Sequence, residues 1–138
     1  MTALIVYVGW SLNVLSHELA HYSMCRLFRR TVRKVQIGSG PSLSIGRFAI
    51  GILPLGGGVH FDAEGLGGLA RRLIFLSGPA VSCIMLVLSH ALAYPGHLVV
   101  EVHAAALLGA SLLCGESSDL HMAFSDGEGG GNGRAEQL

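Results

Sequence analysis

The chain has few charged side chains for its length. Asp, Glu, Lys and Arg make up 13% of its 138 residues, about half the share that is usual in a soluble domain. Hydrophobic residues make up 51%, and the mean hydropathy is +0.56. The formal net charge is zero, so the charge balance gives no sign of a nucleic-acid partner. This composition favours a protein that is embedded in a lipid bilayer, and the length favours a single domain.

Cysteine is also scarce, and its spacing excludes two kinds of site. Cys25, Cys83 and Cys114 are odd in number, and none belongs to a CxxC motif. Neither a disulfide framework nor a cysteine zinc site is therefore indicated. Basic residues are missing from the start of the chain, where a cleaved signal peptide would carry them.

Long apolar runs, in contrast, are abundant. Residues 2–28, 73–92 and 98–114 are each apolar enough and close to the length of about 20 residues that a transmembrane helix needs. Tyr94-Pro95-Gly96 is a turn signal between the last two. We expect residues 1–127 to form one membrane core, and residues 128–138 to be a polar, glycine-rich tail that does not fold alone.

A different pattern fills residues 31–60, between the first two apolar runs. Thr31–Ile37 alternates polar and branched apolar residues, which is typical of a strand. Gly38-Ser39-Gly40-Pro41 suggests a turn, and Ser42–Ile52 suggests one or two further short strands. The predicted fold class is a mainly α membrane protein, with about three transmembrane helices. A small β-sheet or hairpin would lie at the membrane surface between the first and second helices.

Basic residues predict the orientation of these helices. They gather in two groups at the ends of the first connecting loop: Arg26, Arg29, Arg30, Arg33 and Lys34 in one, Arg71 and Arg72 in the other. Loops rich in Lys and Arg remain on the cytoplasmic side. We therefore expect a multi-pass protein of the cytoplasmic membrane, with loop 29–72 and the C-terminus in the cytoplasm.

The motif that points to chemistry is His17-Glu18-Leu19-Ala20-His21, inside the first apolar run. In a helix this spacing places two imidazoles one turn apart, where they can bind zinc, with Glu18 beside them as a general base. Asn13, one turn earlier, is either a support for this site or a plain helix contact. A catalytic zinc needs a third protein ligand, and spacing alone does not separate the candidates, which are Glu101, Glu116, Asp119, His121 and Asp126.

Several motifs in one order resemble the site-2 protease family of intramembrane zinc metalloproteases. They are His17–His21, then Val35–Pro41, then Ile52–Gly57 with its Pro-Leu-Gly-Gly, then Ser77-Gly78-Pro79, then Ser125-Asp126-Gly127. The resemblance covers nearly the whole chain and leaves no room for a PDZ or CBS domain. It implies that His17, His21 and Asp126 bind one Zn²⁺ per chain and that Glu18 is catalytic. It also implies that Gly56, Gly57 and Pro79 lie where substrate binds.

Two departures from the family pattern keep a second function open. Ser82 and Cys83 stand where relatives usually carry an asparagine, and residues 119–122 (Asp-Leu-His-Met) replace Asn-x-x-Pro. The leading hypothesis is a zinc endopeptidase that cleaves a transmembrane or membrane-proximal segment of a membrane protein. The alternative is a weak or inactive relative that binds transmembrane helices. A metal transporter is disfavoured, because transport has no need of Glu18 between the histidines. The sequence does not indicate an oligomeric state.

Overall fold

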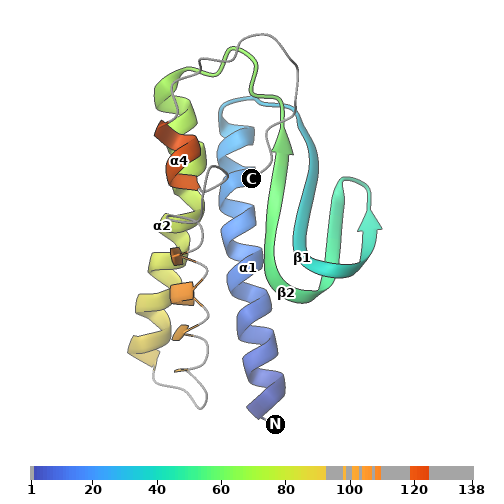
Figure 1. Ribbon diagram of the computed structural model, residues 1–138, viewed down its shortest axis with the longest axis vertical. Helices are drawn as coiled ribbons and strands as arrows, with labels where there is room; N and C mark the ends of the chain where they lie inside the picture. The colour runs from blue at the N-terminus through green and yellow to red at the C-terminus, as the bar shows by residue number, and fades with distance from the viewer. Residues whose placement is uncertain are drawn as a thin grey trace.

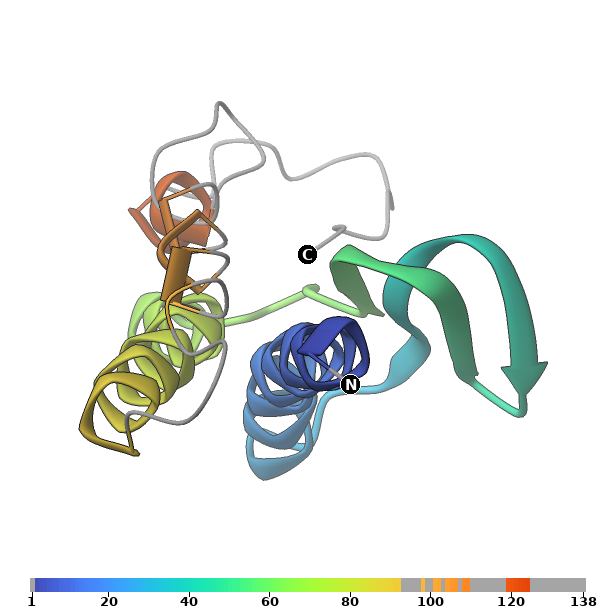
Figure 2. The same ribbon diagram turned by 90° about the horizontal axis from the view of Figure 1, so that it is seen from below.

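Helix α1 (Thr2–Leu27) lies between the second long helix and a β-hairpin. Helix α2 (Gly68–Leu92) packs on one side of it, and strands β1 (Val32–Ile45) and β2 (Phe48–Phe61) pack on the other (Figures 1 and 2). A short helix, α4 (Asp119–Phe124), packs against α2. This computed structural model describes residues 2–92, 98, 101–102, 104–106, 108–109 and 119–124.

The predicted order of helix, hairpin and helix is confirmed, and two of the predicted boundaries change. Helix α2 begins at Gly68 and not at residue 73, with Arg71 donating its backbone N–H to the Gly67 carbonyl at 3.0 Å. The six residues of α4 are helical, although no sequence pattern predicted a helix there. The third predicted span, 98–114, is described only at separate positions, all of them helical, and otherwise lies outside the described residues.

One helix within the described part of the chain is long and apolar enough to cross a membrane. It is Gly68–Ala91, judged by length and composition. Helix α1 has a comparable length, but Asn13, His17, Glu18 and His21 lower its mean hydropathy. Spans at 2–28 and 98–114 therefore remain predictions.

The hairpin has two long strands of 14 residues each, joined by a tight turn at Gly46-Arg47. The predicted turn at residues 38–41 was wrong, because β1 bends there and continues to Ile45. Gly38 makes the bend possible, because its φ of 77° suits glycine and a Cβ would lie 2.6 Å from the Leu53 carbonyl oxygen. The strands curl so that Val35–Ile37 pair with both ends of β2, residues 48–50 and 57–59.

The hairpin runs beside α1 and not beyond its end. The hydroxyl of Tyr7, near the start of α1, donates to the Ile52 carbonyl at 2.6 Å. At about 1.5 Å per residue, Tyr7 lies about 30 Å along the helix from Leu27, after which β1 begins. The hairpin thus follows most of α1, and its place at the membrane surface stays a prediction. The hairpin exposes several large apolar side chains, which are Leu43, Ile45, Ile50, Ile52, Leu53 and Leu55.

A core at the C-terminal end of α1 joins all these elements. It contains the fully buried side chains Cys25, Val35, Val59, Phe61, Ile74 and Phe75, together with Ala123 of α4. Burying a large apolar side chain contributes about 1.5–3 kcal/mol. The core therefore fixes the half of α1 that carries the His-Glu-x-x-His motif against α2, the hairpin and α4.

Candidate metal centre

Helical periodicity turns the polar residues of α1 toward the interior. Asn13, His17, Glu18 and His21 are all buried, none exposing more than 4% of its surface. Asn13, His17 and His21 are spaced four residues apart, so they lie along one stripe of the helix, and Glu18 lies directly beside that stripe. Such a row of buried polar groups is costly unless the groups find partners.

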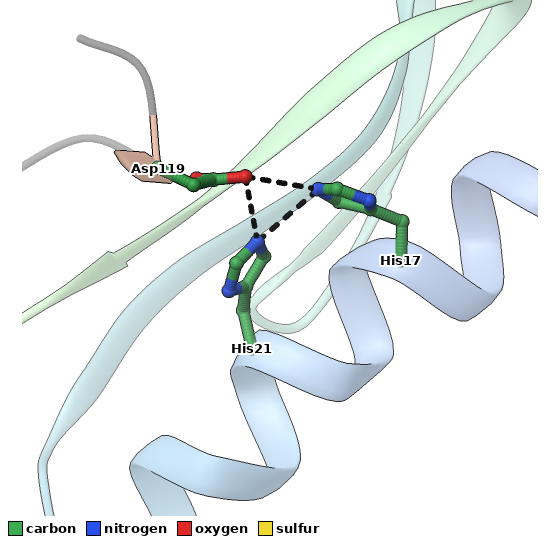
Figure 3. A group of neighbouring side chains, drawn as sticks. All are labelled: His17, His21 and Asp119. Atoms are coloured by element: carbon green, nitrogen blue, oxygen red, sulfur yellow. Dashed lines mark hydrogen bonds and ion pairs between the residues drawn. The ribbon is translucent and has the colours of Figure 1, made fainter. Parts of the chain in front are cut away.

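Asp119 brings a carboxylate to the two histidines. Its Oδ2 lies 3.4 Å from Nε2 of His17 and 3.6 Å from Nε2 of His21. The two Nε2 atoms are 3.2 Å apart. Figure 3 shows the three atoms converging on one point from α1 and from the start of α4. Residues that are about 100 positions apart in the chain thus form a single buried cluster.

These distances fit a zinc ion. Ligand bonds of about 2.0–2.1 Å at tetrahedral angles hold neighbouring ligand atoms about 3.3–3.4 Å apart. The observed triangle has sides of 3.2, 3.4 and 3.6 Å. Two imidazoles and one carboxylate are a donor set that catalytic zinc uses, with a fourth position left for water. The buried Oδ2 of Asp119 also lacks a hydrogen-bond partner among the described residues, as expected of a metal ligand.

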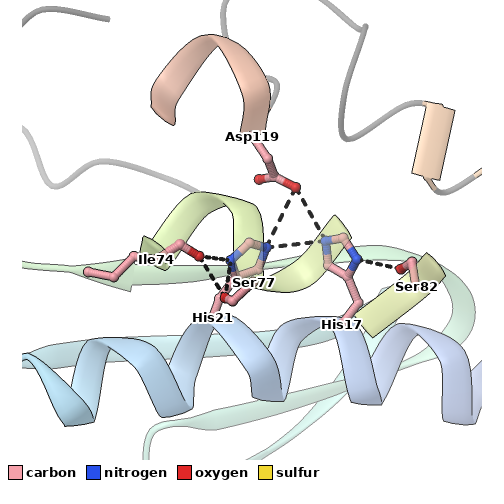
Figure 4. Close-up of polar contacts among 6 residues, drawn as sticks. All are labelled: His17, His21, Ile74, Ser77, Ser82 and Asp119. Carbon is pink, nitrogen blue, oxygen red and sulfur yellow. Dashed lines mark hydrogen bonds and ion pairs between the residues drawn. The ribbon is translucent and has the colours of Figure 1, made fainter. Parts of the chain in front are cut away.

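Helix α2 holds both imidazole rings from the other side (Figure 4). Nδ1 of His21 lies 2.8 Å from the Ile74 carbonyl oxygen, and Nδ1 of His17 lies 2.8 Å from the Ser82 hydroxyl. A carbonyl only accepts, so His21 carries its proton on Nδ1 and presents a free Nε2. Ser82 is fully buried and contacts a predicted ligand directly. The sequence showed that Ser82 and Cys83 stand where relatives usually carry an asparagine, but it did not predict this contact.

Two glycines allow the backbone to approach the site closely. A Cβ on Gly78 would lie 2.6 Å from Nε2 of His17 and would overlap Nε2 of His21. A Cβ on Gly57 would lie 2.8 Å from Cγ of Glu18 and would overlap the Gln36 carbonyl. Because Gly78 has no side chain, α2 can pack directly against both histidines. Gly57 allows β2 to pack against Glu18 in the same way.

The other residues predicted to line the substrate site are Pro79 and Gly56. Pro79 is buried in α2 directly after Gly78. Gly56 has a positive φ of 81°, and a Cβ there would meet nothing within 4 Å. The sequence did not predict the close contact of Gly78 with the histidines, although the Gly78-Pro79 pair marked this part of the chain.

The buried carboxyl of Glu18 lies beside the cluster. Its Oε2 has no hydrogen-bond partner among the described residues. A carboxylate that is buried and unpaired is poorly stabilised, and it is then free to accept a proton from a nearby group. This arrangement suits a general base.

The structure places the candidates for the third zinc ligand in different surroundings. Asp119 joins the histidines, whereas Glu101 pairs with His90 at 3.3 Å, near the opposite end of α2. Asp126 and Glu116 lie outside the described residues, as does the side chain of His121. Burial alone would raise the pKa of Asp119, but its close electrostatic interactions with His17 and His21 bring the pKa below its usual value.

The fold and the cluster define a mostly helical protein with a buried His-His-Asp centre suited to a metal ion. The sequence model of the family described as "Peptidase family M50" matches residues 4–123. Because this is most of the chain, the protein belongs to that family, the site-2 protease family, whose members are membrane-embedded metalloproteases. The matched region includes His17, His21 and Asp119 and ends before Asp126. A comparison with curated proteins gave no match.

Proposed function

We propose that this protein is a zinc-dependent endopeptidase that cleaves a transmembrane or membrane-proximal segment of a membrane protein. The observation that carries the proposal is the triangle of Nε2, Nε2 and Oδ2 atoms, with sides of 3.2–3.6 Å, beside the buried carboxyl of Glu18. Membership of a metalloprotease family supports the same reaction class.

Three residues would hold one Zn²⁺ per chain: His17 and His21 through Nε2, and Asp119 through a carboxylate oxygen. When bound, zinc polarises a carbonyl and lowers the pKa of water toward about 7. Glu18 accepts the proton of the attacking water and delivers it to the amine that leaves when the peptide bond breaks. One carboxylate serves both steps, because the proton gained in the first is the proton needed in the second.

The substrate must meet this centre as an extended segment. A helix keeps its carbonyl groups in hydrogen bonds to the N–H four residues on, so a transmembrane substrate has to unwind before it is cut. Residues 57–59 of β2 pair with β1 on one side, and Gly57 lies against Glu18. We propose that the unwound segment pairs with β2 along Gly57, by addition of a strand. Residues 48–50 are paired on both sides, so they are less suitable.

Access of water fits the proposed orientation. The centre lies in the half of α1 that is followed by the basic residues Arg26, Arg29 and Arg30. If that end faces the cytoplasm, as the positive-inside rule predicts, water reaches the centre over a short path. We therefore propose a multi-pass protein whose loop 29–72 and C-terminus are cytoplasmic.

Cleavage in liposomes tests the proposal. The full chain would be reconstituted with a single-pass membrane protein whose product is separated by electrophoresis. We expect cleavage that stops when a chelator removes zinc and returns when zinc is restored. Glu18→Gln should retain zinc and lose cleavage by a factor of about 10² or more, since general-base catalysis contributes 10²–10⁴. Glu64→Gln, at an exposed loop position, is the matched control and should cleave normally.

Zinc content separates this proposal from its alternative. A protein that binds about one zinc per chain, binds the substrate and cleaves none of a panel of single-pass proteins would be an inactive relative. A protein that binds no zinc after growth in ample metal would contradict the metal site itself. Either result would overturn the endopeptidase proposal.

A further inference from the structure

The two histidines of the centre are held by chemically different partners. His21 meets the backbone carbonyl of Ile74, and His17 meets the side-chain hydroxyl of Ser82, each at 2.8 Å (Figure 4). The first contact is fixed by the course of α2. The second depends on one side chain that is completely buried and faces His17 across the helix pair.

A hydroxyl constrains an imidazole less than a carbonyl does. Because the carbonyl only accepts, it requires a proton on Nδ1 of His21 and leaves Nε2 free. A hydroxyl both donates and accepts, so it fits either tautomer of His17. Only the tautomer in which Nδ1–H donates to the Ser82 oxygen leaves Nε2 of His17 available as a ligand.

We propose that Ser82 is the positioning residue of His17. It receives the Nδ1–H of that ring, and so turns Nε2 toward the point where Asp119 and His21 converge. The inference rests on the metal site of the proposed function and deepens it, because it assigns the support of one ligand to one replaceable side chain. The hydroxyl thus holds the ring of a proposed zinc ligand, in the stretch of α2 where relatives usually carry an asparagine.

A second serine of α2 is a close control. Ser77 is also near a ligand, with its Oγ 3.5 Å from Nδ1 of His21. Its hydroxyl, however, donates to the Ile74 carbonyl of its own helix at 2.7 Å. That carbonyl also accepts from Nδ1 of His21 at 2.8 Å, a closer contact than the one between Ser77 and His21. The same substitution at the two serines should therefore have different effects on zinc.

Zinc affinity of the detergent-purified full chain, measured by competition with a chromophoric chelator, is the direct test. Losing a hydrogen-bond partner of a zinc-binding histidine weakens metal binding by about 10–100-fold. We expect a loss of this size for Ser82→Ala, and a clearly smaller loss for Ser77→Ala, since the contact of Ser77 with His21 is long. Ser82→Thr restores the hydroxyl and should restore most of the affinity. Thermal unfolding of each zinc-free variant shows whether the variant is folded.

A spectroscopic readout on the wild type makes the test independent of any variant's folding. In zinc-loaded protein with ¹⁵N-labelled histidine, we expect the His17 signals to show a proton on Nδ1 and metal on Nε2. Equal zinc affinity in wild type and Ser82→Ala, or metal bound through Nδ1 of His17, would overturn the role of Ser82 while leaving the metal site intact. A wild type without zinc would overturn both.

Discussion

A Cβ atom on Gly78 would lie 2.6 Å from Nε2 of His17. Real Cβ atoms do not approach other atoms so closely, so Gly78→Ala must displace either α2 or the imidazoles. Since both Nε2 atoms are proposed zinc ligands, we expect zinc binding to weaken at least tenfold and the free energy of unfolding to fall by about 1–3 kcal/mol. Metal competition and unfolding in mixed micelles measure these two effects.

Gly68 offers the matched control for this substitution in the same helix. A Cβ on Gly68 would meet nothing within 4 Å, so Gly68→Ala should leave zinc binding unchanged. If Gly78→Ala binds zinc as tightly as Gly68→Ala does, α2 does not pack closely over the histidines in the folded protein.

The third ligand is tested by two aspartates that are close in sequence. Asp119 lies with the histidines and Asp126 lies outside the described residues. We expect Asp119→Ala to abolish stoichiometric zinc, because a zinc site with two protein ligands is weak, and Asp126→Ala to retain about one zinc per chain. Metal analysis of the purified variants measures this. The reverse pattern would assign the ligand to Asp126 and would require the segment after α2 to take another path.

The sequence and the structure agree most closely where the physics is local. Two histidines four residues apart share a face of any α-helix, so the placement of His17, His21 and Glu18 follows from the motif itself. The third ligand depends on how the chain returns from Leu92 to the centre. The position of Asp119 is set by packing such as that of Ala123 of α4 against the common core. Spacing along the chain does not predict such packing.

In the hairpin, too, the locally determined features were predicted from the sequence and the features that depend on tertiary packing were not. Alternation in Thr31–Ile37 predicted a strand, since a period of two is a local property. The glycines at 38 and 40 predicted a turn, but their positive φ values of 77° and 78° serve a bend in a strand that continues. Glycine permits either geometry, and the close approach of Leu53 to Gly38 selects the bend.

Gly57 and Glu18 give a prediction that separates catalysis from metal binding. A Cβ on Gly57 would lie within 2.9 Å of both Cγ and Cδ of Glu18. Gly57→Ala should push the carboxyl away and lower kcat at least tenfold, while zinc content stays at the wild-type value. Cleavage kinetics and metal analysis of the same preparation measure the two effects.

A second glycine of β2 controls for damage to the hairpin. Gly51→Ala would bring its Cβ to 2.7 Å from the Ser39 nitrogen, so it strains the strands at a site whose nearest neighbours are Ser39 and Gly38 and not Glu18. We expect it to reduce stability and retain more of kcat than Gly57→Ala. Equal losses of kcat in the two variants would mean that the hairpin as a whole, and not its contact with Glu18, supports the reaction.

The buried amide of Asn13 marks a position where truncation to alanine should not destabilise the protein. The residue is completely buried, and neither its Nδ2 nor its Oδ1 has a hydrogen-bond partner among the described residues. An unsatisfied buried polar group costs about 1–3 kcal/mol, and alanine is also a better helix former than asparagine. We therefore expect Asn13→Ala to leave the free energy of unfolding unchanged or to raise it by up to about 2 kcal/mol, after the cost of a small cavity.

Tyr7→Phe is the contrasting variant, because it removes the paired 2.6 Å hydrogen bond to Ile52 and should lower stability by about 0.5–1.5 kcal/mol. Denaturant titration in mixed micelles measures both, and a clear loss of stability in Asn13→Ala would show that the amide is satisfied in the folded protein.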